Sequence, residues 1–212
     1  TFDGVKGGDT VTAYPMVTYD ATYSSFTYHP AFKTFLDGKK GAAGTLDAWF
    51  SARTPDELSG YLTEYTEKVR AGAANLPTAK VEGTVTTGTS TTLHLAPGFY
   101  LVLTRTTTAN SLVYTPVAVF ARVMGDHSVK VYAGGSGTEL AAPYTIAMKS
   151  EAAPVITKLV RNTDSDLSGH TPIPPHPTAS IGESDQYGVQ FVIKVPIPNY
   201  KGDPGFTKLT IK

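Results

Sequence analysis

A chain of 212 residues with 18 basic and 18 acidic side chains carries no net charge, so it offers no positive field to attract nucleic acid. It contains no cysteine, which excludes disulfide bonds and thiolate metal sites. No apolar run approaches the length of a membrane span, and the first residues lack the basic and apolar regions of a signal peptide. The abundance of Thr, Gly, Tyr and Pro favours strands and turns over long helices.

The first third of the chain predicts strands followed by one helical block. The segment 9–35 is rich in Thr, Tyr and Val, so we expect two or three strands there. The tetrapeptide TPDE at 54–57 then supplies an N-cap residue, a proline at the first helical position and acidic side chains in the first turn. Apolar residues recur at helical spacing after it, and a shorter helix is expected over 46–52. We therefore expect the helices to lie within 44–73.

After the helical block the pattern returns to strands separated by turn residues. Strands are expected over 80–86, 91–95, 98–104, 113–123 and 128–132. The segment 148–154 is small, polar and ends in proline, which is the composition of a short and stiff linker. We therefore expect two domains, 1–150 and 151–212, a division that the length of the chain allows.

The second expected domain contains a lysine within an apolar strand. Lys158 lies in the sequence VITKLV at 155–160, where an ammonium group is costly to bury without a partner. The segment 187–200 alternates Val, Phe, Ile and Val with other residues, and this period of two predicts a strand with one buried face. Between them, 168–177 is too rich in proline to form a helix or a central strand, so we expect a surface loop.

Two segments resemble a known family. Residues 153–200, in which the strand with Lys158 is followed by a polar loop and the strand YGVQFVIKVPIPNY, resemble the start of the isopeptide-forming domain of Gram-positive sortase-assembled pilins. The segment PGFYLVL at 97–103 is similar to a strand of the immunoglobulin-like domains of such proteins. The resemblance implies a mainly β fold. An immunoglobulin-like, collagen-adhesin-like β-sandwich with a helical insertion would occupy 1–150, and the incomplete start of a second β-sandwich would occupy 151–212.

The resemblance also implies roles for two lysines. Lys158 would form an intramolecular isopeptide bond with an asparagine, assisted by a buried carboxyl group, and both partners are expected beyond residue 212. The alternative is a strand lysine whose ammonium reaches solvent. Lys149 lies where shaft pilins carry the lysine that sortase joins to the next subunit. Because Ala147 and Met148 replace the Tyr-Pro pair of that motif, an ordinary solvated linker lysine is the other interpretation.

The implied function is structural: a subunit of a covalently polymerised pilus, anchored in the cell wall outside the cell, that mediates adhesion. The implied partners are other pilin subunits, a pilus-specific sortase and a host or bacterial surface ligand. The alternative is a wall-anchored adhesin that binds a host glycan or matrix protein and does not polymerise.

The sequence predicts no enzyme, because it contains no nucleophile in a Gly-x-Ser-x-Gly context. We expect no cofactor and no metal either. The histidines lack zinc spacing, and the segment NTDSD at 162–166 lacks the later glycine and glutamate of a calcium loop.

Overall fold

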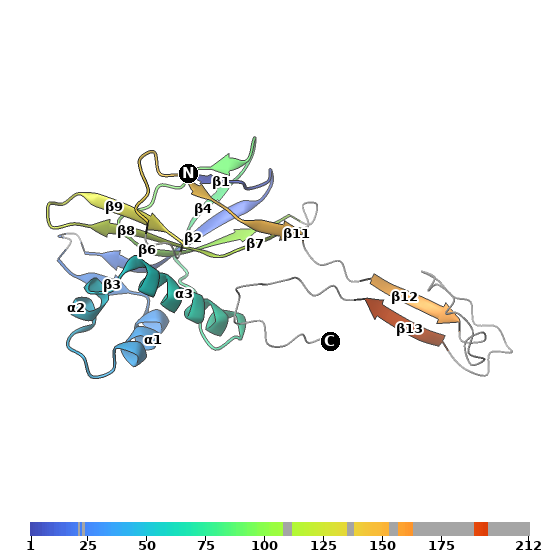
Figure 1. Ribbon diagram of the computed structural model, residues 1–212, viewed down its shortest axis with the longest axis horizontal. Coiled ribbons are helices and arrows are strands. Elements are labelled where there is room, and N and C mark those ends of the chain that lie inside the picture. Colours follow the sequence, from blue (N-terminus) through green and yellow to red (C-terminus); the bar gives the residue numbers. More distant parts are fainter. Residues whose placement is uncertain are drawn as a thin grey trace. The chain divides into compact units, whose positions relative to one another are not determined.

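The structure is a computed structural model that describes residues 1–20, 22, 24–107, 112–134, 138–152, 157–162 and 189–194. The chain is mainly β, as the sequence predicts, with several antiparallel sheets and a few helices. It divides into two compact units, Thr1–Ala152 and Ala153–Lys212. Most elements of both units are labelled in Figure 1.

The first unit is built on an antiparallel sheet in the order β3-β2-β6-β8-β9, with β4 paired to the same edge of β2 as β3. The six strands are β2 (Thr10–Tyr19), β3 (Phe26–Tyr28), β4 (Val81–Thr84), β6 (Gly98–Arg105), β8 (Val117–Val123) and β9 (Val129–Ala133). Strand β6 is central and buried on both faces, which explains its unbroken apolar run.

A β-bulge in β2 adjusts which side chains face the helices. The register with β6 shifts between Pro15 and Val17, so Met16 is the extra residue. Met16 and Val17 therefore both enter the same apolar cluster instead of alternating between the two faces of the sheet.

Three helices cover one face of the sheet (Figure 1): α1 (Pro30–Lys40), α2 (Leu46–Ser51) and α3 (Pro55–Arg70). Helix α3 begins as the sequence predicts, because Thr54 and Glu57 form a reciprocal capping box ahead of it. The cluster beneath the helices contains many aromatic rings. Phe99 of β6, for example, meets Phe120 of β8 edge-on with 5.6 Å between the ring centroids.

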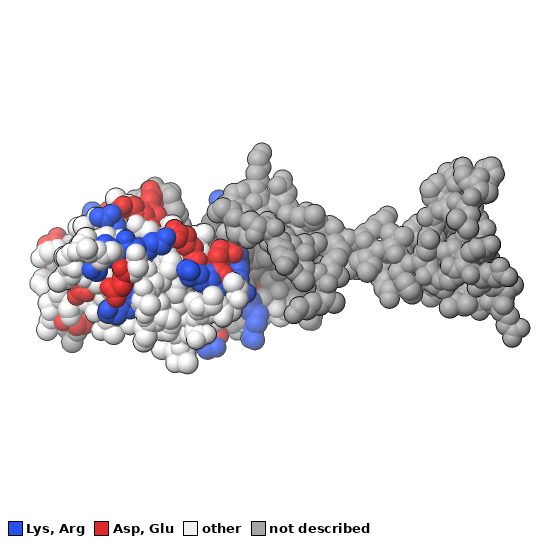
Figure 2. Space-filling model, turned by 90° about the horizontal axis from the view of Figure 1, so that it is seen from below, with Lys and Arg blue, Asp and Glu red and all other residues white. Residues whose placement is uncertain are grey.

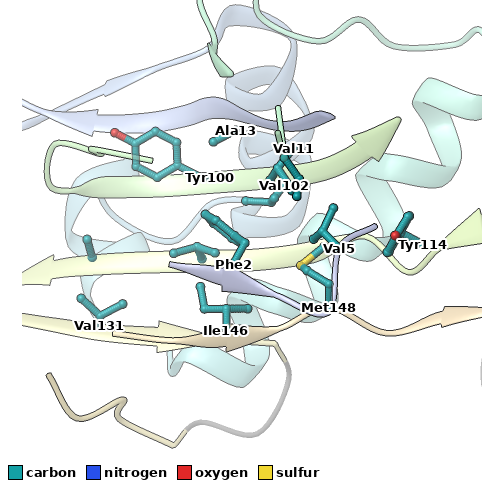
Figure 3. Packing of buried hydrophobic residues seen from close by; sticks show 13 residues of the cluster. Phe2, Val5, Val11, Ala13, Tyr100, Val102, Tyr114, Val131, Ile146 and Met148 are labelled. Atoms are coloured by element: carbon teal, nitrogen blue, oxygen red, sulfur yellow. The ribbon is translucent and has the colours of Figure 1, made fainter. Parts of the chain in front are cut away.

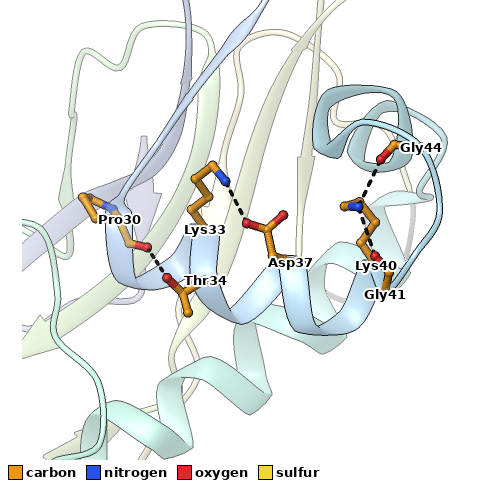
Figure 4. A network of polar contacts seen from close by, with 7 residues as sticks. All are labelled: Pro30, Lys33, Thr34, Asp37, Lys40, Gly41 and Gly44. Atoms are coloured by element: carbon orange, nitrogen blue, oxygen red, sulfur yellow. Dashed lines mark hydrogen bonds and ion pairs between the residues drawn. The ribbon is translucent and has the colours of Figure 1, made fainter.

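Helix α1 corrects two expectations, since a strand was expected over 9–35 and the helices were expected within 44–73. Pro30 occupies the first turn, and the apolar side chains of Phe32 and Leu36, four positions apart, are both fully buried. Figure 4 shows the polar contacts along this helix. The ammonium of Lys33 pairs with Asp37 at 2.7 Å, and Lys40 donates to carbonyl oxygens of the loop that follows the helix.

A small sheet of three strands covers the opposite face of the main sheet. It consists of β1 (Phe2–Asp3) between β10 (Ile146–Ala147), which is parallel to it, and β5 (Ser90–Thr91), which is antiparallel. Figure 3 shows the apolar cluster on this side, to which β1 contributes Phe2 and the C-terminal end of the unit contributes Ile146 and Met148.

Two further pairs of strands complete the description. In the first unit, β7 (Leu112–Tyr114) pairs antiparallel with β11 (Ser150–Ala152). In the second unit, β12 (Thr157–Asn162) pairs antiparallel with β13 (Val189–Lys194). The Pro-rich segment 168–177 and the segment 163–166 lie outside the described residues.

Candidate functional site

Lys149 follows β10 on an extended segment at the C-terminal end of the first unit. Along this segment buried and exposed residues alternate: Ile146 and Met148 face the apolar cluster, whereas Ala147 and Lys149 are exposed. This alternation is the pattern of a strand with one buried face. The core thereby holds the residue before Lys149 and leaves the side chain of Lys149 in solvent.

Backbone hydrogen bonds hold the segment on both sides of Lys149. Before it, the amide of Met148 donates to the carbonyl oxygen of Asp3, at 2.8 Å. At Lys149 itself, the carbonyl oxygen accepts from the amide of Thr115, at 2.9 Å. Directly after it, Ser150 pairs with Tyr114 as β11 joins β7. Lys149 therefore lies where the chain passes from the sheet of β1 to the sheet of β7.

The chain divides into its two units after Ala152, within the segment 148–154 that was expected to be a linker, but these contacts show that 148–152 are part of the first unit. Met148 is buried, and Ser150–Ala152 are a strand of the first unit. The side chains of β11 are exposed, which accounts for the polar composition of the segment. Its backbone is nevertheless paired with β7.

Gly4 allows the turn after β1 to approach Met148. Its φ is +79°, a conformation that side-chain-bearing residues rarely adopt, and a Cβ atom placed there would lie 3.0 Å from the carbonyl oxygen of Met148. The glycine thus meets both a conformational and a steric requirement directly beside the segment that carries Lys149.

The amine of Lys149 differs from most of the other lysine amines that the structure describes. Five lysines make side-chain polar contacts: Lys33, Lys39, Lys40, Lys80 and Lys130. Within the described part of the chain, the ammonium groups of Lys6, Lys68 and Lys149 have neither an ion-pair nor a hydrogen-bond partner, and all three residues are exposed. An exposed and unpaired amine can reach and attack a large electrophile such as an enzyme-bound acyl group.

A buried polar network lies beside this segment, and sequence reasoning did not find it. Asp9 is fully buried, and its carboxylate accepts hydrogen bonds from the hydroxyl of Tyr114 and from the amide of Thr107, each at 2.9 Å. The same hydroxyl accepts from the amide of Lys6, at 2.9 Å. Burial raises the pKa of Tyr114, the amide of Lys6 opposes the rise and Asp9 adds to it, so the hydroxyl stays a donor at neutral pH. Asp9 follows two turn glycines at the very start of the segment expected to form strands, and no sequence signal pointed to its burial.

Lys158 lies in β12, and the structure describes its backbone but not its side chain. Its Cα partner is Ile193, and Val160 on the same strand pairs with Phe191. Because successive residues of a strand alternate between faces, Lys158 shares a face of the hairpin with Val160, Phe191 and Ile193. The register places Lys158 on a face that also carries apolar residues, and its role stays a prediction.

Metal and membrane sites are missing from the part of the chain that the structure describes. No group of His, Asp and Glu there could hold a metal ion, and none of the described helices has the length and hydrophobicity to cross a membrane. Asp20 has the densest set of donors, but these belong to its own loop. Although burial opposes it, hydrogen bonds from Ser24, Thr22 and Ser25 lower the pKa of this carboxylate.

The helix-covered face of the first unit bears interspersed charges. Figure 2 shows Lys and Arg side chains among Asp and Glu side chains over its described surface. Several of them form ion pairs, such as Arg53 with Glu57 at 2.9 Å and Arg70 with Glu67 at 2.7 Å. This pattern does not favour nucleic acid as a partner.

Comparison with known proteins does not identify the chain. No family model matches it, and none of the curated proteins matches it by sequence. The fold and the surroundings of Lys149 therefore carry the functional argument.

Proposed function

We propose that this chain is the N-terminal part of a pilus subunit, and that a sortase polymerises the subunit through the amine of Lys149. The observation that carries the proposal is that this amine is exposed on a segment whose backbone is held in place. Lys149 is exposed, its ammonium group has no polar partner within the described residues, and its backbone is held from both sides. The resemblance of 153–200 and 97–103 to sortase-assembled pilins supports the same conclusion.

The proposed reaction is an acyl transfer. A donor subunit, cleaved after a threonine, is bound to the sortase cysteine as a thioester. The neutral amine of Lys149 attacks the thioester carbonyl carbon, so that a C–N bond forms and the C–S bond breaks. The proton that the amine loses passes to the departing thiolate. The product is an amide between two subunits, and no oxidant or cofactor is required.

In the second unit we propose that Lys158 forms an intramolecular isopeptide bond to an asparagine of a longer chain. The support is the apolar face that Lys158 shares with Phe191 and Ile193 in the register of β12 and β13. Burial there would lower the pKa of the amine and make its neutral form accessible. Each bond releases one ammonia, so the intact mass of the longer protein would be lower by that amount, and Lys158→Ala would restore it. An uncorrected mass in the unmodified protein would overturn this assignment.

The proposed location is the cell surface, with the subunit anchored in the cell wall. The proposed partners are further subunits, the pilus sortase and an adhesion ligand on a host or bacterial surface. The immunoglobulin-like class of the first unit is part of the same proposal. It is supported by the antiparallel sheet and the apolar layer beneath β1, β5 and β10.

The test of the proposal is the covalent ladder of subunits in cell-wall extracts. Lys149→Arg keeps the positive charge but lacks a nucleophilic amine, so we expect it to abolish the ladder. Lys68→Ala is the matched control, because Lys68 is also exposed and unpaired but lies on α3. A ladder that survives Lys149→Arg but disappears with Lys6→Ala would assign the linkage to Lys6. A protein that shows adhesion and no ladder in any strain would be the non-polymerising adhesin.

A further inference from the structure

We infer that Asp9 and Tyr114 are positioning residues for Lys149, because their hydrogen bonds join the two strands between which Lys149 is held. The inference rests on the proposed function of Lys149 as the acceptor. In this proposal Asp9 and Tyr114 do not touch the reacting atoms. They act only through the backbone of the segment that carries Lys149.

The segment that carries Lys149, residues 146–152, is held by two separate sets of backbone contacts. Up to Met148 the segment is held by β1, through the backbone bond to Asp3 and the parallel pairing of Phe2 with Ile146. From Lys149 onward it is held by Thr115 and by β7. These supports belong to different sheets, so the segment is fixed only if the two sheets are fixed relative to each other.

The hydroxyl of Tyr114 connects these two sets of contacts. Tyr114 is the residue of β7 that pairs with Ser150, directly after Lys149. Its hydroxyl accepts from the amide of Lys6, in the turn that follows β1, and donates to Asp9. One oxygen atom therefore connects the turn after β1 to the strand that holds the other side of Lys149.

Asp9 holds the hydroxyl of Tyr114 in place, and Asp9 is itself fixed by several hydrogen bonds. Its amide donates to the carbonyl oxygen of Lys6, at 3.0 Å, and its carbonyl oxygen accepts from Val85, also at 3.0 Å. Its second carboxylate oxygen accepts from Thr107 at the end of β6. A buried carboxylate with its hydrogen bonds made is costly to disturb, so the network favours one arrangement of these strands.

Tyr114→Phe is the sharpest perturbation, because it removes the hydroxyl and keeps the ring in its apolar cluster. Loss of this connection lets the turn after β1 and β7 move independently, so the amine of Lys149 occupies the orientation that the sortase needs for a smaller fraction of the time. The expected kinetic effect is a fall in kcat for acyl transfer, with a smaller change in KM for the acceptor.

Tyr65→Phe is the matched control. Tyr65 is also buried, and its hydroxyl donates one hydrogen bond to the carbonyl oxygen of Asn75 at 2.7 Å, whereas the hydroxyl of Tyr114 makes two hydrogen bonds. It belongs to the other apolar cluster, beneath the helices, and lies on α3. Loss of a buried tyrosine hydroxyl is therefore common to the two variants, whereas loss of the connection between Lys6, Asp9 and β7 is specific to Tyr114→Phe.

The experiment measures initial rates of amide formation with the full subunit as acceptor, the pilus sortase and a soluble donor peptide that carries the sortase recognition sequence. We expect kcat to fall about tenfold for Tyr114→Phe, the ratio expected when one hydrogen bond to a charged group is lost, and to change less than twofold for Tyr65→Phe. Amide hydrogen exchange at Ser150–Ala152 should become faster only in Tyr114→Phe. If Tyr114→Phe does not fold, Asp9→Asn, which keeps the shape of the side chain, replaces it.

Equal rate constants for Tyr114→Phe and Tyr65→Phe, or unchanged exchange at Ser150–Ala152, would overturn the positioning role. Lys149→Arg in the same assay separates this outcome from failure of the proposed function. If Lys149→Arg still forms product at the unmodified rate, the acceptor assignment fails, and the positioning role of Asp9 and Tyr114 fails with it.

Discussion

Replacing Gly4 with alanine perturbs the segment of Lys149 from its buried side. The alanine must adopt a φ of +79°, and its Cβ atom would lie 3.0 Å from the carbonyl oxygen of Met148. Two costs therefore add. The left-handed backbone costs an alanine about 1 kcal/mol, and the forced shift of Met148 costs about 1 kcal/mol more.

Gly88→Ala isolates the first of these costs. Gly88 has a similar φ of +72°, but an added Cβ atom would have no neighbour within 4 Å. We therefore expect Gly88→Ala to lower the free energy of unfolding by about 1 kcal/mol and Gly4→Ala to lower it by about 2 kcal/mol. For a protein of this size the corresponding falls in Tm are about 2–4 °C and about 4–8 °C.

The measurement is urea unfolding followed by tryptophan fluorescence. The chain has a single tryptophan, Trp49 in α2, so the signal reports on the first unit alone. Hydrogen exchange of the Met148 amide, which donates to Asp3, should become faster in Gly4→Ala and stay unchanged in Gly88→Ala. Equal losses of stability in the two variants would refute the argument that close approach to Met148 matters.

Three further variants test other parts of the first unit. Hydrogen bonds from Thr54 and the nearby Arg53 lower the pKa of Glu57, so the stability that Glu57 contributes is complete above its usual pKa of 4.5 and is lost as the pH falls through its lowered value. The difference in unfolding midpoint between the unmodified protein and Glu57→Ala should therefore shrink in acid, and a difference independent of pH would contradict this. Burial lowers the pKa of His29, whose Nδ1 atom is buried without a partner, so stability should fall as the pH drops below 6.5. His29→Ser should remove that fall and stabilise α1 by about 1 kcal/mol as a better N-cap, and an unchanged pH profile would count against it. Phe99→Ala should cost about 3–5 kcal/mol, because the ring is buried among three other rings, whereas the exposed Val129→Ala should cost less than about 0.5 kcal/mol; similar losses would be inconsistent with the packing.

Local signals in the sequence predicted some elements and not others. Helix α3 and its first residue could both be predicted, because the capping residues and the spacing of the apolar residues indicate the same helix. Helix α1 was missed because the residue before Pro30 is histidine, which makes no side-chain cap here, and because the preceding residues are rich in strand formers. The spacing of Phe32, Phe35 and Leu36 was the available signal for a helix, and it was outweighed by composition.

The role of Lys149 stays a prediction, and the strands around it could not be predicted from the sequence. The resemblance to pilins pointed to the residue itself. The strands that hold it are two or three residues long, too short to show a period, and their partners lie more than thirty residues away in the sequence. Asp9 and Tyr114 are 105 residues apart, so only the fold brings them together. For the second unit, the pairing of β12 with β13 agrees with the two strands expected there.

The parallel pairing of β1 with β10 also constrains the order in which the chain can fold. Phe2 pairs with Ile146, so β1 has no partner on that side until almost the whole unit has been made. Contacts between residues so distant in sequence form late, because the intervening chain must first be closed into a loop. A growing chain therefore lacks the frame around Lys149 until the strands that hold it have paired. Only a finished unit therefore holds the backbone of Lys149 from both sides.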